Sequence, residues 1–111
     1  MKYFGFFKGM KYGKCEDDFD SYRKIRNNME KSRVLKYIKS LPIAGVAPMT
    51  TEDIFSGEVL EQAGIIEDGD FAFPIDFIHY YENYDIGIPT DYEDYILEKH
   101  GKMRESILDR I

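Results

Sequence analysis

The fold is decided by one stretch of sequence, Ile65-Ile66-Glu67-Asp68-Gly69-Asp70-Phe71-Ala72-Phe73. An Asp-Gly pair between two apolar segments is typical of the tight turn of a β-hairpin, because glycine adopts the positive φ that such a turn requires. We therefore predict antiparallel strands on either side of Asp68-Gly69, with Phe71 and Phe73 on one face. Pro74 follows directly and suits the first turn of a helix, where its missing N–H is not needed.

Two helices are predicted beyond this hairpin. The first covers 75–83, and the second opens at Pro89-Thr90, where Thr90 and Glu93 have the spacing of a capping box. Gly101 should end the second helix and leave 102–111 as a frayed or short helical tail. The inner side of the first helix would carry Phe77, Ile78, Tyr81 and Tyr84.

The chain before the hairpin supplies one long helix and several short elements. A helix is predicted over 18–40, broken near Asn28 and stopped before Pro42, because apolar residues recur there at three- and four-residue spacing. Residues 43–48 are apolar and β-branched, as in a buried strand. Thr50 or Thr51 would then cap a short acidic helix. The inner residues of that helix would be Ile54, Val59 and Leu60.

The first 14 residues form an aromatic and basic segment punctuated by glycine. This pattern indicates one or two short strands, or an extended stretch, that packs some of its rings inward. The candidates are Tyr3, Phe4, Phe6 and Phe7.

Together these elements predict an α+β protein, with three to four helices packed on a small antiparallel sheet or hairpin. A length of 111 residues, 43% hydrophobic residues and 32% charged residues are typical of one globular domain, which we expect to cover 1–111. Cys15 is the single cysteine, which excludes an intrachain disulfide and fits a reducing cytoplasm. Lys8, Lys11 and Lys14 interrupt the apolar N-terminus too early for a signal peptide.

Charge is distributed very unevenly along the chain. The formal net charge is −6, but residues 1–40 carry +6 and residues 41–111 carry −12. No Lys or Arg occurs between Lys39 and Lys99, a window that contains fourteen acids. An acidic surface can serve solubility alone, yet a field of one sign also steers an oppositely charged partner. Because nucleic acid would be repelled, we expect a basic protein partner, with no direct nucleic-acid or membrane binding.

Catalytic and metal-binding patterns are weak. His79 and His100 are the side chains suited to acid–base work near neutral pH, and neither belongs to a recognisable motif with Ser or Cys. A hairpin turn explains the carboxylates at 67–70 more simply than a Mg²⁺ or Ca²⁺ site does. The sequence has no Walker loop, dinucleotide fingerprint or zinc spacing, so we expect no cofactor, no metal and no enzymatic activity.

Residues 34–99 resemble a group of small bacterial proteins with a recurring order of features. The features are a helix ending in Tyr-Ile-Lys-Ser, a short apolar strand, an acidic stretch, an aromatic Asp-Gly hairpin, a double-Tyr helix and a Pro-led helix. Here they are Val34–Ser40, Ala44–Pro48, Glu52-Asp53, Asp68–Pro74, Tyr80-Tyr81 and Ile88–Tyr92. Such proteins are similar to the immunity proteins of polymorphic or contact-dependent growth inhibition toxins. The resemblance implies a cytoplasmic antitoxin that binds one cognate toxin.

Resemblance and charge lead to the same functional hypothesis, an inhibitor that neutralises a basic toxin, namely a nuclease, through an acidic, tyrosine-bearing face. The alternative is a non-catalytic adaptor, or a nucleic-acid mimic, for another basic cytoplasmic protein. Ordinary helix packing is the competing explanation for the tyrosines. The predicted partner-binding residues are Asp68, Asp70, Asp76, Tyr80, Glu82, Tyr84, Asp85, Asp91, Asp94 and Tyr95.

Overall fold

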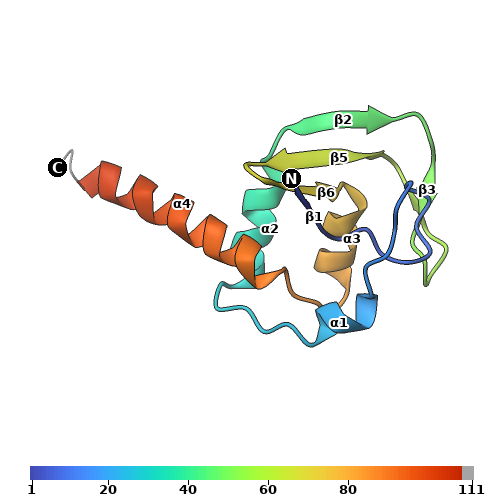
Figure 1. The fold of residues 1–111 in the computed structure, drawn as a ribbon, viewed down its shortest axis with the longest axis horizontal. Coiled ribbons are helices and arrows are strands. Elements are labelled where there is room, and N and C mark those ends of the chain that lie inside the picture. Colours follow the sequence, from blue (N-terminus) through green and yellow to red (C-terminus); the bar gives the residue numbers. More distant parts are fainter. Residues whose placement is uncertain (109–111) are drawn as a thin grey trace.

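The computed structural model describes the backbone of residues 1–108 and the side chains of residues 1–99. Within this part the chain is a single α+β globule, as the sequence predicts, with four helices, a four-stranded sheet and a two-stranded sheet (Figure 1). In chain order the elements are β1 (Lys2–Tyr3), α1 (Phe19–Arg23), α2 (Lys31–Lys39), β2 (Ile43–Ala47), β3 (Thr51–Glu52), β4 (Val59–Leu60), β5 (Ala63–Asp68), β6 (Phe71–Pro74), α3 (Asp76–Asn83) and α4 (Thr90–Leu108).

The predicted hairpin is confirmed as β5 and β6. These strands are antiparallel, with Ile66 opposite Phe73 and Asp68 opposite Phe71, and Gly69 in the turn has a φ of +59°. The four-stranded sheet has the order β1-β6-β5-β2. β1 runs parallel to β6, so the sheet is mixed and the prediction of an antiparallel sheet is wrong for this strand. Pro74 closes β6, and α3 begins two residues later.

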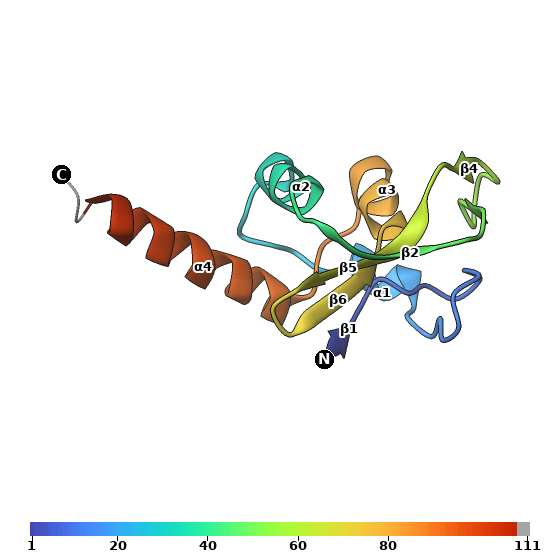
Figure 2. The ribbon, with the colours of Figure 1, turned by 90° about the horizontal axis from the view of Figure 1, so that it is seen from above.

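The core lies between the sheet and the helices. Figure 2 shows α2 and α3 on the same side of the sheet. Phe71 and Phe73 are both buried, as predicted, and they contact Phe4 from the N-terminal segment and Tyr92 from α4. The first segment therefore contributes to the core through Phe4 and the buried Phe7, whereas Tyr3 is exposed and Phe6 is half-buried.

The helix predicted over 18–40 is two helices, α1 and α2, separated by a non-helical stretch. Asn27 explains the interruption, because its side chain bonds to both backbone groups of Ile88, donating to the carbonyl at 3.0 Å and accepting from the N–H at 2.9 Å. Gly87 N–H also donates to the Tyr22 carbonyl at 3.0 Å. These bonds join the stretch after α1 to the loop before α4. They would be lost if α1 continued as a helix through Asn27.

The acidic helix predicted after Thr50 is instead a second hairpin, formed by β3 and β4. Its turn is held by Asp53, whose Oδ1 accepts the N–H of Phe55 at 2.7 Å and that of Ser56 at 3.0 Å. Gly57 completes the turn with a φ of +77°. Thr51, one of the two expected capping residues, lies in β3, and the Asp53 side chain closes a turn where the helix was expected to begin.

Three further predictions differ from the structure. β2 is an exposed edge strand rather than a buried one, and Val46 on it is 65% exposed. α4 continues through Gly101 to Leu108, so 102–108 are helical, while 109–111 lie outside the described residues. Figure 1 shows this helix projecting away from the sheet. Glu93 does not form the expected box but is buried, and its carboxylate accepts the N–H of Met29 at 2.9 Å.

The helix predicted over 75–83 is confirmed as α3. Phe77 and Tyr81 are buried on its inner side as predicted, with Tyr80 beside them. No helix in the described part of the chain has the length and apolar composition needed to cross a bilayer.

Candidate functional site

Three of the predicted partner-binding residues are buried. Asp68 is 4% exposed, Asp76 2% and Tyr80 0%. The Tyr80 hydroxyl accepts the N–H of Ile54 at 2.8 Å, so this tyrosine joins α3 to the β3–β4 hairpin. The prediction that these side chains form part of an exposed face is therefore wrong.

Asp68 is the centre of a buried polar cluster. Its carboxylate accepts hydrogen bonds from Tyr37 at 2.6 Å, Tyr92 at 2.9 Å and Tyr95 at 3.3 Å, and Lys99 Nζ lies 3.4 Å away. Burial and the neighbouring carboxylate raise the pKa of the Tyr37 hydroxyl to about 12, with Lys99 opposing them, so this hydroxyl remains a donor at neutral pH. The cluster joins the β5–β6 turn to α2 and α4, so its role is to stabilise the fold.

The other predicted residues are exposed, apart from the half-buried Tyr84 and Tyr95, and they fall into two groups on different elements. Asp70 and Asp91 both contact Lys2. The backbone N–H of Lys2 donates to the Asp70 carbonyl at 2.6 Å, and its Nζ lies 3.4 Å from the Asp91 carboxylate. Asp94 lies one turn along α4, and Tyr95 packs on Phe71. The other group lies at the end of α3 and comprises Glu82, Tyr84 and Asp85.

The group at the end of α3 adjoins a second polar cluster, which the sequence did not reveal. Asp53, from the β3–β4 hairpin, is buried, and its Oδ2 lies 2.7 Å from His79 Nε2 and 2.7 Å from the Tyr84 hydroxyl. Burial alone would raise the pKa of Asp53, but bonds from these two side chains and from the N–H groups of Ser56 and Phe55 outweigh it and lower this pKa to about 2. Asp53 is therefore ionised at neutral pH and holds the hairpin against α3.

His79 is engaged at both ring nitrogens. Nε2 faces Asp53, Nδ1 lies 3.3 Å from the side-chain amide of Asn83, and Glu58 lies 3.7 Å from Nε2. The histidine side chain is only 20% exposed. This arrangement suits an orienting network more than a proton shuttle, because each nitrogen already has a protein partner.

A groove of about 420 Å³ runs between the β3–β4 hairpin and α3, and we call it the hairpin groove. Its acidic lining residues come from both elements, Glu58 and Glu61 from the hairpin side and Glu82 from α3. Apolar side chains lie between them, among them Val59, which is 59% exposed. The full lining is Glu58, Val59, Leu60, Glu61, Gln62, Ile75, Asp76, Ile78, His79 and Glu82.

The hairpin groove carries little compensating positive charge. Glu82 pairs with Lys39 at 2.9 Å, and this lysine lies outside the lining of the groove. Glu61 has no ion pair among the described side chains. Phe55, at the tip of the hairpin, is 53% exposed and packs on Phe19 and Tyr84. Acidic side chains thus flank exposed apolar ones, as at the edge and centre of protein interfaces.

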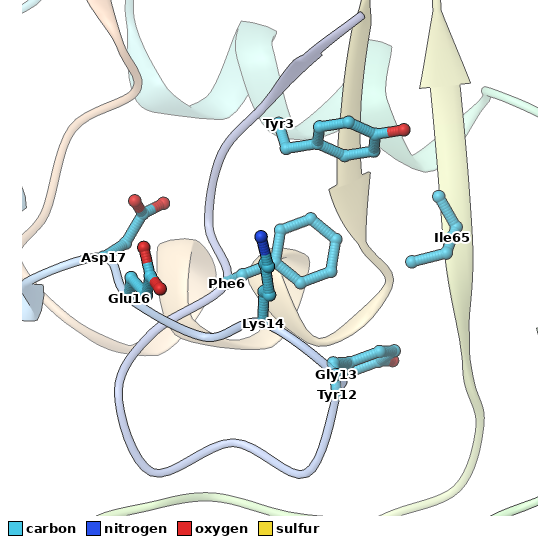
Figure 3. A pocket seen from close by; sticks show the side chains of 8 residues that line it. All are labelled: Tyr3, Phe6, Tyr12, Gly13, Lys14, Glu16, Asp17 and Ile65. Atoms are coloured by element: carbon cyan, nitrogen blue, oxygen red, sulfur yellow. The ribbon is translucent and has the colours of Figure 1, made fainter.

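A different hollow, of about 480 Å³, lies between the N-terminal segment and β5 (Figure 3). It is mainly aromatic, with Phe6 and Tyr12 rings 5.5 Å apart and Ile65 on the strand side. The Tyr12 hydroxyl accepts the N–H of Gly64 at 3.0 Å and donates to Asp76 at 2.8 Å. The Tyr12 hydroxyl thereby joins the N-terminal segment to β5 and α3.

The side chains of residues 1–99 include no group of three or more His, Cys, Asp or Glu arranged to hold a metal ion. Comparison with known proteins finds no matching family model, curated protein or solved structure. The hairpin groove is the surface that combines acidic side chains, the exposed apolar Val59 and a rigid support from the Asp53 cluster.

Proposed function

We propose that this protein is an immunity-type inhibitor that binds a basic toxin, a nuclease domain, through the hairpin groove and neutralises it without catalysis. The observation that carries the proposal is the acidic groove itself, in which Glu58, Glu61 and Glu82 lie around apolar side chains, of which Val59 is exposed. The resemblance of residues 34–99 to immunity proteins supports the same reading.

Apolar and acidic side chains would contribute to binding in different ways. Val59 in the groove and Phe55 at the neighbouring tip of the hairpin present exposed apolar surface, whose burial would supply much of the affinity. The surrounding carboxylates would speed the encounter with a positively charged surface and occupy the positions of substrate phosphates in a nuclease cleft. Asp53 would keep the hairpin rigid, so that little conformational freedom is lost on binding.

The proposal moves the binding face away from α4. Asp91 and Asp94 remain exposed and acidic, but Asp91 already faces Lys2, and the nearby tyrosines pack against the core. The end of α3 retains its predicted role, because Glu82 lines the groove and Tyr84 supports Phe55.

A non-catalytic adaptor for another basic protein would use the same groove, and specificity separates the two functions. An immunity protein should bind one cognate toxin tightly and fail against close variants, whereas an adaptor should accept several partners.

The experiment is capture of the basic protein encoded beside this gene, at low and at high salt, with a parallel assay of its toxicity when both proteins are co-expressed. The proposal expects one basic partner, slower or weaker binding at high salt, and suppressed toxicity. Binding with undiminished toxicity would favour the adaptor. If the neighbouring protein is not retained at either salt, the inhibitor proposal fails.

A further inference from the structure

Two buried oxygen atoms lack a hydrogen-bond partner within the described side chains, Thr51 Oγ1 and Asp76 Oδ2. Each residue is 2% exposed. An unsatisfied buried hydroxyl or carboxylate oxygen is costly, and a native protein seldom keeps one without a use for it. The other oxygen of Asp76 accepts the Tyr12 hydroxyl at 2.8 Å, which fixes the carboxylate in place.

Both residues line one hollow on the N-terminal side of the β3–β4 hairpin, and we call it the Thr51 pocket. Its volume is about 470 Å³, enough for a single long side chain. One wall is the hairpin, and the other is the N-terminal loop at Gly9, Met10 and Lys11. The Thr51 pocket and the hairpin groove share one lining residue, Asp76.

The charges of the Thr51 pocket favour a cation. Glu52, Asp53 and Asp76 line it, against one base, Lys11, which lies 3.7 Å from Glu52. Both oxygens of Asp53 are already occupied, by backbone N–H groups and by His79 and Tyr84. Asp76 Oδ2 is therefore the buried carboxylate oxygen of this lining that remains for a ligand.

We propose that the Thr51 pocket receives one arginine side chain of the basic partner, whose guanidinium donates to Asp76 Oδ2 and Thr51 Oγ1. A guanidinium fits because it carries five N–H donors in a fixed plane and can satisfy two separate acceptors at once. The described residues offer no set of three metal-binding side chains there, which favours an organic cation over a metal ion. This inference rests on the proposed function, since it names the partner group that would anchor beside the groove.

The test uses the full chain and two short peptides, acetyl-Gly-Arg-Gly-amide and the same peptide with citrulline in place of arginine. Binding is followed by NMR through the methyl groups of Thr51 and Ile54, which lie in the lining of the Thr51 pocket. We expect the arginine peptide to shift both signals saturably and the neutral citrulline peptide to shift neither. Equal responses to the two peptides, or no response to either, would overturn the inference.

Two variants sharpen the result. Thr51→Val removes the unpaired hydroxyl, so we expect it to raise the midpoint of thermal unfolding by about 4 °C or more and to weaken arginine binding about tenfold, read at Ile54. Asp76→Asn should weaken binding as well, whereas the exposed Asp94→Asn, with the same change of charge, should not. If Thr51→Val instead lowers the midpoint of thermal unfolding, the hydroxyl makes a hydrogen bond in the free protein, for example to water. That result would overturn the inference.

The peptide assay needs no natural partner, so its failure leaves the hairpin groove proposal intact. Conversely, the protein could respond to the arginine peptide and yet retain no basic partner in the capture experiment. In that case the inhibitor proposal fails and the cation-binding site stands.

Discussion

Asp53→Asn should destabilise the protein by roughly 2–3 kcal/mol at pH 7. Ionised Asp53 has its pKa lowered from 3.8 to about 2, and a shift of this size corresponds to about 2.4 kcal/mol of stability. Asparagine can still accept the N–H groups of Phe55 and Ser56, but its amide nitrogen replaces the oxygen that His79 and Tyr84 contact at 2.7 Å. Two lost hydrogen bonds at a buried site give a similar figure.

The sign of the pH dependence follows from the lowered pKa. The stabilisation is fully present above the unfolded value near 3.8 and is lost as pH falls through the folded value of about 2. The difference between the two proteins should therefore shrink to about half at pH 3. Urea unfolding followed by circular dichroism at pH 7 and pH 3 measures it. Asp94→Asn, exposed on α4, is the control and should change stability by less than about 0.5 kcal/mol.

The reasoning is refuted if Asp53→Asn unfolds within about 0.5 kcal/mol of the unmodified protein at pH 7. It is also refuted if the difference grows on acidification, because the carboxylate would then stabilise the unfolded chain.

Two further substitutions test other parts of the fold. Tyr92→Phe removes a buried donor 2.9 Å from Asp68 and should cost about 1–3 kcal/mol in urea unfolding, with the secondary structure unchanged; an unaltered midpoint would show that the cluster does not stabilise the protein. Gly5→Ala places a Cβ 2.6 Å from the Phe77 ring at a φ of +78°, so thermal unfolding should occur several degrees lower; a midpoint at or above that of the unmodified protein would contradict the close packing.

Turn residues that are neighbours in the sequence predict one of the two hairpins correctly. The β5–β6 hairpin was predicted because its turn residues and its apolar strands are neighbours in sequence, and the glycine has the expected positive φ. The sequence predicts a helix at the second hairpin because Thr50 and Thr51 have the side chains of a helix cap, but Thr51 lies in β3 and Asp53 closes a turn instead. The Asp53-x-x-Ser56-Gly57 spacing was the signal that could have distinguished them.

Long-range pairing explains the remaining differences. Asp68 looked exposed as a turn residue, but Tyr37 and Tyr92, which are 31 and 24 residues away, reach it and make its burial possible. The parallel pairing of β1 with β6 likewise joins the first and last strands of the described sequence and has no local signature. The acidic character of the second half was visible in the sequence, but which carboxylates remain exposed depended on these distant partners.

The most direct test of the central claim, that the hairpin groove is the partner-binding surface, compares two double charge reversals. Glu58→Lys with Glu61→Lys alters the groove, and Asp91→Lys with Asp94→Lys makes the same change of charge on α4. The affinity of the captured basic partner for each purified variant is measured by calorimetry at physiological salt. Our account predicts a loss of at least about a hundredfold for the groove variant, or roughly 2.7 kcal/mol, and less than about tenfold for the α4 variant. Equal losses, or a larger loss on α4, would contradict it.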